Sequence, residues 1–418
     1  MKQINECRIC KNKNLKKIVN LGNLSFTGIF PKKINQKISK GRLELLKCHG
    51  HKEKVCGLVQ LSYNFNLNQM YGKNYGYRSS LNNSMIVHLK KIISNIKNEI
   101  SLKENDLIID IGSNDGTTLS FYDNYKFKLV GIDPTAKYFK KYYKKNIKII
   151  SDFFSKKIIN KYNYKKKAKL ITSFAMFYDL KKPLDFAKII SETLNEEEGL
   201  WVFEQSYLPT MLKNASYDTI CHEHIEYYAL KQIQWICNNT NLKIIDIEKT
   251  NANGGSILIK CSHKNSKYKP NNRKINNMLK SEKILGLDNL NIYKKFVLNI
   301  EESKNKLIKI IRNIKNKGKK VFAIGASTKG NVILQYCNLD KTFIDSVGEI
   351  NKDKFGSFTP GTKIPILDEK KILSNNFDDY FLILPWHFKY FFLNSKIYKN
   401  KNIIFPLPKV KIYKTKSN

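Results

Sequence analysis

A turn that combines glycine with acidic side chains follows the apolar run 107–111. The turn, residues 112–116, reads Gly-Ser-Asn-Asp-Gly, and Asp110 lies just before it in the apolar run. A second apolar run ends at Asp133, about twenty residues further on, where Rossmann-like folds bind ribose hydroxyls. This arrangement predicts a nucleotide-containing cofactor. The alternative is an ordinary turn between a strand and a helix that binds no ligand.

The spacing of the two glycines separates the candidate cofactors. Dinucleotide sites use Gly-x-Gly-x-x-Gly so that a pyrophosphate can approach the N-terminus of a helix. Here Gly112 and Gly116 enclose a bulkier polar Ser-Asn-Asp, and the carboxylates of Asp110 and Asp115 would repel a pyrophosphate. Those carboxylates suit a ligand that carries an amine, a carboxylate and a sulfonium cation. These are the parts of S-adenosylmethionine (SAM), which we predict as the cofactor.

The segment Cys221-His222-Glu223-His224 is the strongest catalytic candidate. It comes after the apolar run that ends near residues 203–207, and α/β domains place ligands beyond the carboxyl ends of their strands. In an extended segment, His222 and His224 would face one side and Glu223 the other. Imidazole accepts a proton near neutral pH, and a carboxylate can hold its tautomer. We predict acid–base catalysis here; the alternative is a polar loop with chance histidines.

Four cysteines near the N-terminus have the spacing of a metal site. Cys7 and Cys10 form a Cys-x-x-Cys pair, and Cys48 and Cys56 follow. Two cysteines three residues apart can bind one ion, and a segment this small needs a stabilising crosslink. We predict a structural zinc ion with four thiolate ligands, with His49 and His51 as competing ligands. The alternative is four reduced cysteines without a metal.

A third cluster, residues 71–80, is rich in tyrosine and contains Tyr75, Tyr77 and Arg78. Aromatic rings beside a single arginine could bind a sugar or a nucleotide. They could equally form an aromatic joint between domains.

The elements that must position these groups alternate along the chain. A helical period covers residues 85–100, and strand patterns then recur with helical stretches between them, which predicts a doubly wound α/β sheet. The expected strands are 107–111, 128–132, 147–150, 170–174, 199–204, 242–247 and 255–261. A polar linker is expected at 262–277 and a basic helix at 301–317. A second Rossmann-like unit opens at 321–331, with further strands at 345–350 and 381–386.

Composition places weaker bounds on function. The formal net charge of +40 would favour a nucleic-acid or membrane partner. Only five of the basic residues are arginine, however, and the lysines are spread along the chain among asparagine and isoleucine. We therefore expect no specific nucleic-acid binding. No apolar run is long enough to cross a membrane and no signal-peptide core is present, so we expect a cytoplasmic protein.

Taken together, these motifs resemble the SAM-dependent sugar C-methyltransferases, which methylate C3 of nucleotide-linked 4-keto deoxysugars. The resemblance covers nearly the whole chain. It rests on the Cys-x-x-Cys start, Cys-Gly-Leu-Val-Gln-Leu, Tyr-Gly-Tyr-Arg-Ser-Ser, Ile-Gly-Ser-Asn-Asp-Gly, Gly-Ile-Asp-Pro-Thr, His-Glu-His, Gly-Ala-Ser-Thr-Lys-Gly-Asn and Thr-Pro-Gly-Thr. It implies a zinc-binding domain at 1–85 and a class I SAM-methyltransferase domain at 86–265. A Rossmann-like domain at 266–418 would help to hold the nucleotide sugar.

The resemblance also implies roles for individual residues. His224 would be the base that removes the proton beside the ketone, with Glu223 supporting it, and Tyr75 or Tyr77 would lie against the sugar. Residues of the SAM site would be Gly112, Asn114, Asp115 and Asp133, with Asp152 and Phe153 near the adenine. Related chains often have tyrosine at the position of Cys221, and some have histidine in the loop that contains Asp179. Both departures concern the choice of sugar and of the carbon that is methylated.

Two other functions are compatible with the residues alone. One is a SAM-dependent O- or N-methyltransferase that acts on another small molecule, which would need no C–H acid. The other is a zinc-containing protein that binds nucleic acid through its charge, which predicts steeply salt-dependent binding. The sequence does not indicate an oligomeric state.

Overall fold

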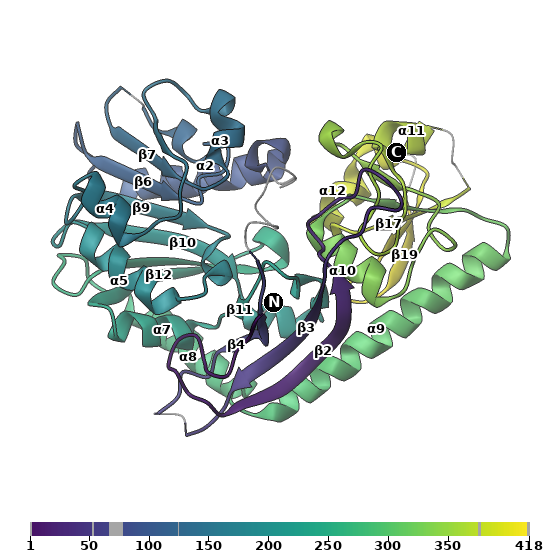
Figure 1. Ribbon diagram of the computed structural model, residues 1–418, viewed down its shortest axis with the longest axis horizontal. Coiled ribbons are helices and arrows are strands. Elements are labelled where there is room, and N and C mark those ends of the chain that lie inside the picture. The colour runs from purple at the N-terminus through teal and green to yellow at the C-terminus, as the bar shows by residue number, and fades with distance from the viewer. Residues whose placement is uncertain (1, 52–53, 67–77, 124, 375–377, 416–418) are drawn as a thin grey trace.

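Three β-sheets organise the chain in the computed structural model, which describes residues 2–51, 54–66, 78–123, 125–374 and 378–415. A seven-stranded sheet lies on the left of Figure 1 and a six-stranded sheet on the right. A four-stranded sheet from the N-terminal segment lies below and between them, beside the long helix α9. The predicted α/β class is confirmed.

The seven-stranded sheet has the order β12-β13-β10-β9-β6-β7-β8. Its strands β6 to β10 run parallel, and the hairpin β12–β13 closes one edge antiparallel. The helix α2 (Asn83–Glu99) packs through Ile93 and Ile96 on one face. The strand bounds are β6 Leu107–Ile111, β7 Lys128–Ile132, β8 Lys148–Ile150, β9 Ala168–Phe174, β10 Leu200–Ser206, β12 Leu242–Thr250 and β13 Ser256–His263. All seven predicted strands are therefore present.

Short helices complete this part of the chain. They are α3 Ala136–Phe139, α4 Lys156–Lys161, α5 Pro183–Thr193, α6 Leu208–Lys213 and α7 Leu230–Asn238. The 112–116 turn leads into a 3₁₀ turn at Leu119–Phe121, where a doubly wound sheet would ordinarily place an α-helix. The carboxylates of Asp115 and Asp133 hold the neighbouring turns, since each accepts a hydrogen bond from the hydroxyl of the threonine two residues later.

Two other expectations require correction. The segment 262–277 is not a continuous linker, because α8 (Asn272–Leu285) begins inside it with the side chain of Asn271 as its N-cap. The basic helix also begins earlier than expected. As α9 it runs over Leu290–Asn316, and its buried stripe starts with Tyr293 and Phe296, which lie before the predicted range. Apolar residues at helical spacing, rather than the charge of the segment, decide its length.

The four-stranded sheet joins segments that are distant in sequence. Its order is β11-β4-β3-β2, with bounds Glu226–Tyr227, Val59–Leu61, Lys40–Cys48 and Leu15–Ser25. The strand β11 directly follows the His-Glu-His segment, and Glu226 pairs with Gln60 of β4. The N-terminal segment therefore holds the end of the candidate catalytic loop. A further pair, β1 (Lys2–Gln3) and β5 (Tyr63–Asn64), lies apart from this sheet.

The six-stranded sheet forms the predicted second Rossmann-like unit, with the order β16-β15-β14-β17-β18-β19. Its strands are β14 Val321–Ile324, β15 Val347–Glu349, β16 Ile366–Asp368, β17 Tyr380–Ile383, β18 Asn402–Phe405 and β19 Lys411–Lys414. The helices are α10 Thr328–Tyr336, α11 Glu369–Ser374 and α12 Lys389–Asn394. The side chain of Ser327 accepts a hydrogen bond from Gly330 N and so begins α10.

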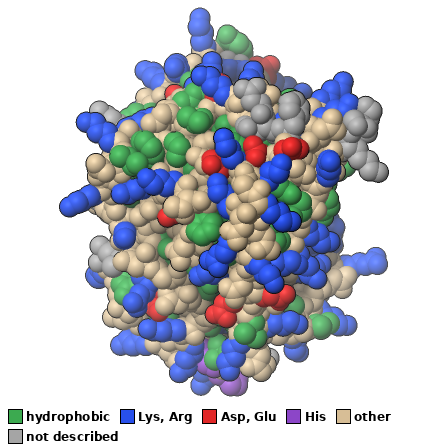
Figure 2. Space-filling model, turned by 90° about the vertical axis from the view of Figure 1, so that its right-hand side faces the viewer, with side chains coloured by type: hydrophobic (Ala, Val, Ile, Leu, Met, Phe, Trp, Pro, Cys, Tyr) green, Lys and Arg blue, Asp and Glu red, His purple; other side chains and the backbone are tan. Residues whose placement is uncertain are grey.

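Basic side chains are spread over the face of the molecule that Figure 2 shows. On the face in Figure 2, lysine and arginine side chains are scattered among neutral ones, with a few acidic groups between them. Within the described ranges, no helix combines the length and the hydropathy that crossing a bilayer would require.

Candidate functional site

The 112–116 turn is fastened to the strand beside it. Gly112 and Gly116 have φ values of 73° and 77°, and a Cβ on Gly116 would lie 2.8 Å from the ring of Tyr143. The amide of Asn114 donates to Asp133 Oδ2 at 2.9 Å. The carboxyl ends of β6 and β7 therefore meet at this turn, where an α/β domain places a nucleotide.

Asp133 is held rigidly at the end of β7. Its Oδ1 accepts hydrogen bonds from the amide and the hydroxyl of Thr135, both at 2.6 Å. A carboxylate has about four acceptor positions, and three are used here, so one remains to accept from a ribose hydroxyl. These residues fit the adenosine part of SAM.

Replacing Asp133 with alanine tests this assignment. We expect Asp133→Ala to weaken the binding of S-adenosylhomocysteine about 10- to 100-fold, since a hydrogen bond to a charged group contributes about 1.5–3 kcal/mol. Isothermal titration calorimetry measures this change. Asp123→Ala is the matched control, because Asp123 Oδ1 also accepts from nearby amides in an exposed turn of the same domain. Equal affinities for the two variants would contradict the assignment.

The side chains of Asn114 and Asp115 bind protein rather than facing open space. Asn114 Oδ1 accepts from the amide of Ser79, and Asp115 Oδ2 accepts from that of Ser80, both at 3.1 Å. Arg78 lies over the Tyr142 ring, 3.8 Å from its centroid, with its Nε 3.7 Å from Asp115 Oδ2. Residues 78–80 therefore close over the turn, a contact that sequence reasoning missed.

The remaining cofactor candidates differ in their surroundings. Asp110 is buried and accepts from Thr172 Oγ1 at 2.6 Å, and burial raises the pKa of its carboxyl to about 7. Asp152 and Phe153 follow β8 at the same edge of the sheet, and both are exposed. Asp152 Oδ1 accepts from the amide of Phe153. Tyr75 and Tyr77 lie outside the described residues.

His224 has the geometry of a neutral proton acceptor. Its Nδ1 lies 3.0 Å from the carbonyl of Thr219, so Nδ1 carries the hydrogen and Nε2 keeps its lone pair. The ring lies 4.3 Å from that of Tyr178, and the side chain remains partly exposed. Burial lowers the pKa of His224 to about 3, with a further contribution from the charge of Lys329. The imidazole is therefore unprotonated at neutral pH.

The expected alternation of His222, Glu223 and His224 is wrong, because the chain bends at His222 and Glu223. His222 points into the N-terminal segment, packs on Phe26 and Phe65, and lies 3.2 Å from the Gly41 carbonyl. It is fully buried, so it does not share a face with His224.

Glu223 also lies elsewhere than expected. The tautomer of His224 is held by the Thr219 carbonyl, not by this carboxylate. A Cβ on Gly28 would lie 2.2 Å from Glu223 Oε1, which shows how closely this side chain approaches the N-terminal segment. Burial raises the pKa of Glu223.

Two positions that depart from the family pattern lie beside this site. Cys221 is fully buried, and burial raises the pKa of its thiol, followed by the charges of Glu223 and Asp179. Asp179 lies at the end of a 3₁₀ turn after β9 and is partly exposed.

The C-terminal sheet contributes groups that sequence reasoning did not assign. Trp386 Nε1 donates to Asp218 Oδ2 at 2.8 Å, and Lys329 Nζ donates to the carbonyl of Asn253 at 2.8 Å. His387 is half-buried, and burial lowers its pKa to about 3. The signal in the sequence was their position, since Lys329 lies in the turn after the first predicted strand of this unit and Trp386 ends the predicted strand 381–386.

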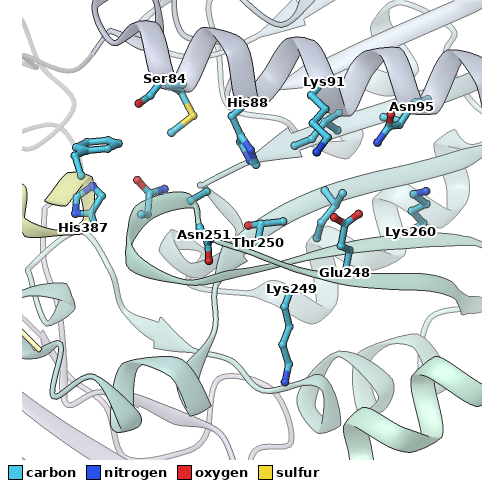
Figure 3. A pocket seen from close by; sticks show the side chains of 17 residues that line it. Ser84, His88, Lys91, Asn95, Glu248, Lys249, Thr250, Asn251, Lys260 and His387 are labelled. Atoms are coloured by element: carbon cyan, nitrogen blue, oxygen red, sulfur yellow. The ribbon is translucent and has the colours of Figure 1, made fainter. Parts of the chain in front are cut away.

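A cavity of about 420 Å³ lies between α2 and the β12–β13 hairpin (Figure 3). His88 and Thr250 line it, and His387 closes the end next to the C-terminal sheet. His88 Nε2 lies 3.0 and 2.9 Å from the two oxygens of Glu204, and Thr250 Oγ1 donates to Glu204 Oε1 at 2.6 Å. The hydrogen bond with Glu204 raises the pKa of His88. Sequence reasoning missed this pair.

The four N-terminal cysteines come together as predicted. Their Sγ atoms all lie within 4.8 Å of one another, and Cys7–Cys56 and Cys10–Cys48 are each 3.5 Å apart. Tetrahedral zinc with bonds of about 2.3 Å requires sulfur separations of about 3.8 Å, which fits. Among the described residues, neither His49 nor His51 belongs to the cluster.

Comparisons with known proteins cover nearly all of the chain. Family models match a zinc binding domain at 7–71, a methyltransferase domain at 85–247 and a C-methyltransferase C-terminal domain at 251–408. The C-methyltransferase NovU of Streptomyces niveus is 24% identical over 424 residues, which cover 100% of this chain and 99% of that one. The zinc binding model includes all four cysteines.

Two solved methyltransferase structures match a little under half of the chain, with low TM-scores. The carbon methyltransferase CurJ is 9% identical with a TM-score of 0.34, over 47% of this chain and 58% of its own. A SAM-dependent methyltransferase from Aquifex aeolicus is 14% identical with a TM-score of 0.30, over 42% of this chain and 97% of its own.

Proposed function

Because the chain is a SAM-dependent C-methyltransferase, we propose that it methylates a carbon beside the ketone of a nucleotide-linked 4-keto deoxysugar, with C3 as the first candidate. The observation that carries the proposal is His224. Its Nδ1 is bound to the Thr219 carbonyl, which leaves Nε2 free to accept a proton. A C-methyltransferase needs such a base, because the acceptor carbon must first lose its hydrogen.

The residues would divide the reaction as follows. His224 Nε2 takes the proton from the carbon beside the ketone, and the C–H bonding pair becomes the enolate. Bound SAM would supply the methyl group as an electrophile: the enolate carbon would form the new C–C bond, and the S–CH₃ bonding pair would stay on the sulfur of S-adenosylhomocysteine. Asp133 and the 112–116 turn hold the adenosine part in position, so that orientation supplies much of the remaining rate.

The energetics require more than this base. The pKa of the substrate C–H group is higher than that of imidazolium, and each pKa unit of this difference adds about 1.4 kcal/mol to the free energy of proton transfer. The low pKa of His224 makes the difference larger. The site must therefore stabilise the enolate oxygen with a charge or a hydrogen-bond donor.

The three parts of the chain would act together. We infer that residues 1–85, 86–265 and 266–418 are the zinc, SAM and nucleotide-sugar domains respectively. Tyr75 and Tyr77 are proposed to contact the sugar. Cys221 and Asp179 are proposed to influence which sugar is accepted.

The test is a reaction of the full chain with SAM and dTDP-4-keto-6-deoxyglucose, followed by mass spectrometry and NMR. We expect a product heavier by one methyl group, attached to a carbon that flanks C4. In D₂O, with S-adenosylhomocysteine in place of SAM, the same carbon should exchange its hydrogen. Methylation on oxygen or nitrogen, or no reaction with any 4-keto sugar nucleotide, would reject the proposal.

A further inference from the structure

Lys329 occupies a junction of three parts of the chain. It is the second residue of α10, in the turn that follows β14 of the C-terminal sheet. Its Nζ donates to the carbonyl of Asn253, in the loop after β12, at 2.8 Å. The neighbouring Asn331 donates from Nδ2 to the Thr27 carbonyl of the N-terminal segment at 2.7 Å. The bond to Asn253 fixes the position of the Lys329 ammonium, and the bond to Thr27 fixes the start of α10 against the N-terminal segment.

The ammonium is partly buried and has no salt-bridge partner within the described ranges. One backbone carbonyl uses one of its three hydrogens, which leaves two donors available. Burial lowers the pKa of Lys329, and the charge of Asp218 opposes this change. A buried cation without an ion-pair partner is costly, and such groups usually bind a ligand or a developing charge.

Lys329 also lies near the candidate base. The Lys329 charge contributes to the lowered pKa values of His224 and His387, and it interacts with Cys221. Thr328, the residue before Lys329, approaches the same point as Glu223: a Cβ added to Gly28 would lie 3.4 Å from Thr328 Oγ1 and also close to the Glu223 carboxylate. The His-Glu-His loop and the start of α10 therefore face each other across this junction.

We propose that Lys329 is a catalytic residue whose ammonium donates a hydrogen bond to the enolate oxygen that forms when His224 removes the substrate proton. The inference rests on the proposed function and adds the electrophile that the reaction requires. As the C–H bonding pair becomes the C=C bond, the carbonyl π pair moves to oxygen beside this cation. The pair returns when the carbon takes the methyl group, and the His224 proton passes to solvent.

An alternative role is to hold the diphosphate of the sugar nucleotide. The surroundings disfavour it, because a diphosphate carries two or more negative charges, and the junction places a single lysine beside the carboxyl groups of Asp218 and Glu223. A single developing negative charge suits one free cation better.

The experiment compares Lys329→Met and Lys329→Ala with the wild type and with Lys304→Met. Lys304 is the matched control, because its Nζ lies over the Tyr336 ring, 4.3 Å from the centroid, away from the junction. Three quantities are measured: hydrogen exchange of dTDP-4-keto-6-deoxyglucose in D₂O with S-adenosylhomocysteine present, kcat for methylation, and the Kd of dTDP.

We expect exchange and kcat to fall together about 10²- to 10³-fold in both Lys329 variants, as for removal of an oxyanion donor. The Kd of dTDP should change less than about threefold, and a small primary amine should restore exchange in Lys329→Ala. Unchanged exchange would overturn the proposal, as would a large loss of dTDP affinity with normal exchange. If the wild type neither exchanges nor methylates, the proposed function has failed and the role of Lys329 falls with it.

Discussion

His224→Asn should lower both methyl transfer and substrate hydrogen exchange by about 10²- to 10⁴-fold, the usual contribution of a general base. Asparagine can still donate to the Thr219 carbonyl in place of Nδ1, but it offers no basic nitrogen. The loss should appear in exchange rates in D₂O, which report proton removal without methyl transfer. Binding of S-adenosylhomocysteine should be unchanged, because the cofactor turn lies on other strands.

The pH dependence of substrate hydrogen exchange tests the protonation state of His224. Because the pKa of His224 is lowered to about 3, the unprotonated form persists as pH falls well below 6.5. The rate of exchange should therefore show no loss from protonation of His224 between pH 6 and 8. An acidic limb near pH 6.5 that disappears in His224→Asn would contradict the assigned state of the imidazole. His263→Asn, at the end of β13, is the control and should keep full activity.

Loss of the zinc ion should be the most damaging change to the fold. Replacing Cys7 or Cys48 with serine removes one of four thiolates, and structural zinc sites of this type bind with about 10–16 kcal/mol of apparent free energy that supports folding. We expect less than one zinc per chain by elemental mass spectrometry and a lowered, broadened thermal transition. Cys337→Ser is the matched control, because Cys337 is equally buried but lies outside the cluster.

Zinc loss should also reduce catalysis, because the zinc segment holds the catalytic loop. Between Cys7 and Cys10, the amide of Arg8 donates to Gln60 Oε1 at 3.1 Å, and Arg8 Nη1 lies 3.4 Å from the carbonyl of Ile225, next to His224. The pairing of β11 with β4 fastens the same loop. A chelated enzyme that loses its zinc yet retains its melting temperature and its exchange rate would show that the metal supports neither.

The sequence alone was sufficient for the parts in which local spacing sets the structure. The turn that follows β6 and the acidic residue after β7 were predicted, and the strands of the central sheet were predicted to within three residues at each end. Short apolar runs and glycine turns determine those elements locally. The four cysteines were predicted as one group because the Cys-x-x-Cys pair and the two later cysteines have the spacing of a zinc site in a short segment.

The structure alone decided which side chains share the site. His222 and His224 are two residues apart, yet the bend between them sends one into the N-terminal core and the other to the junction. The Thr219 carbonyl, rather than Glu223, holds the tautomer of His224. No period in the sequence encodes that bend, because it depends on β11 pairing with a strand more than 160 residues away.

The same reasoning applies to Lys329 and to the pair of His88 with Glu204. The sequence places Lys329 near a strand end and His88 on a helix, but their partners are distant in sequence. Lys329 bonds to Asn253, and His88 bonds to Glu204, which is 116 residues away. Residue types and their local spacing were enough to predict SAM and a four-cysteine zinc site, and the resemblance of the motifs indicated methyl transfer to carbon. Only the folded structure shows which charges surround His224, because burial and proximity between distant segments set those charges.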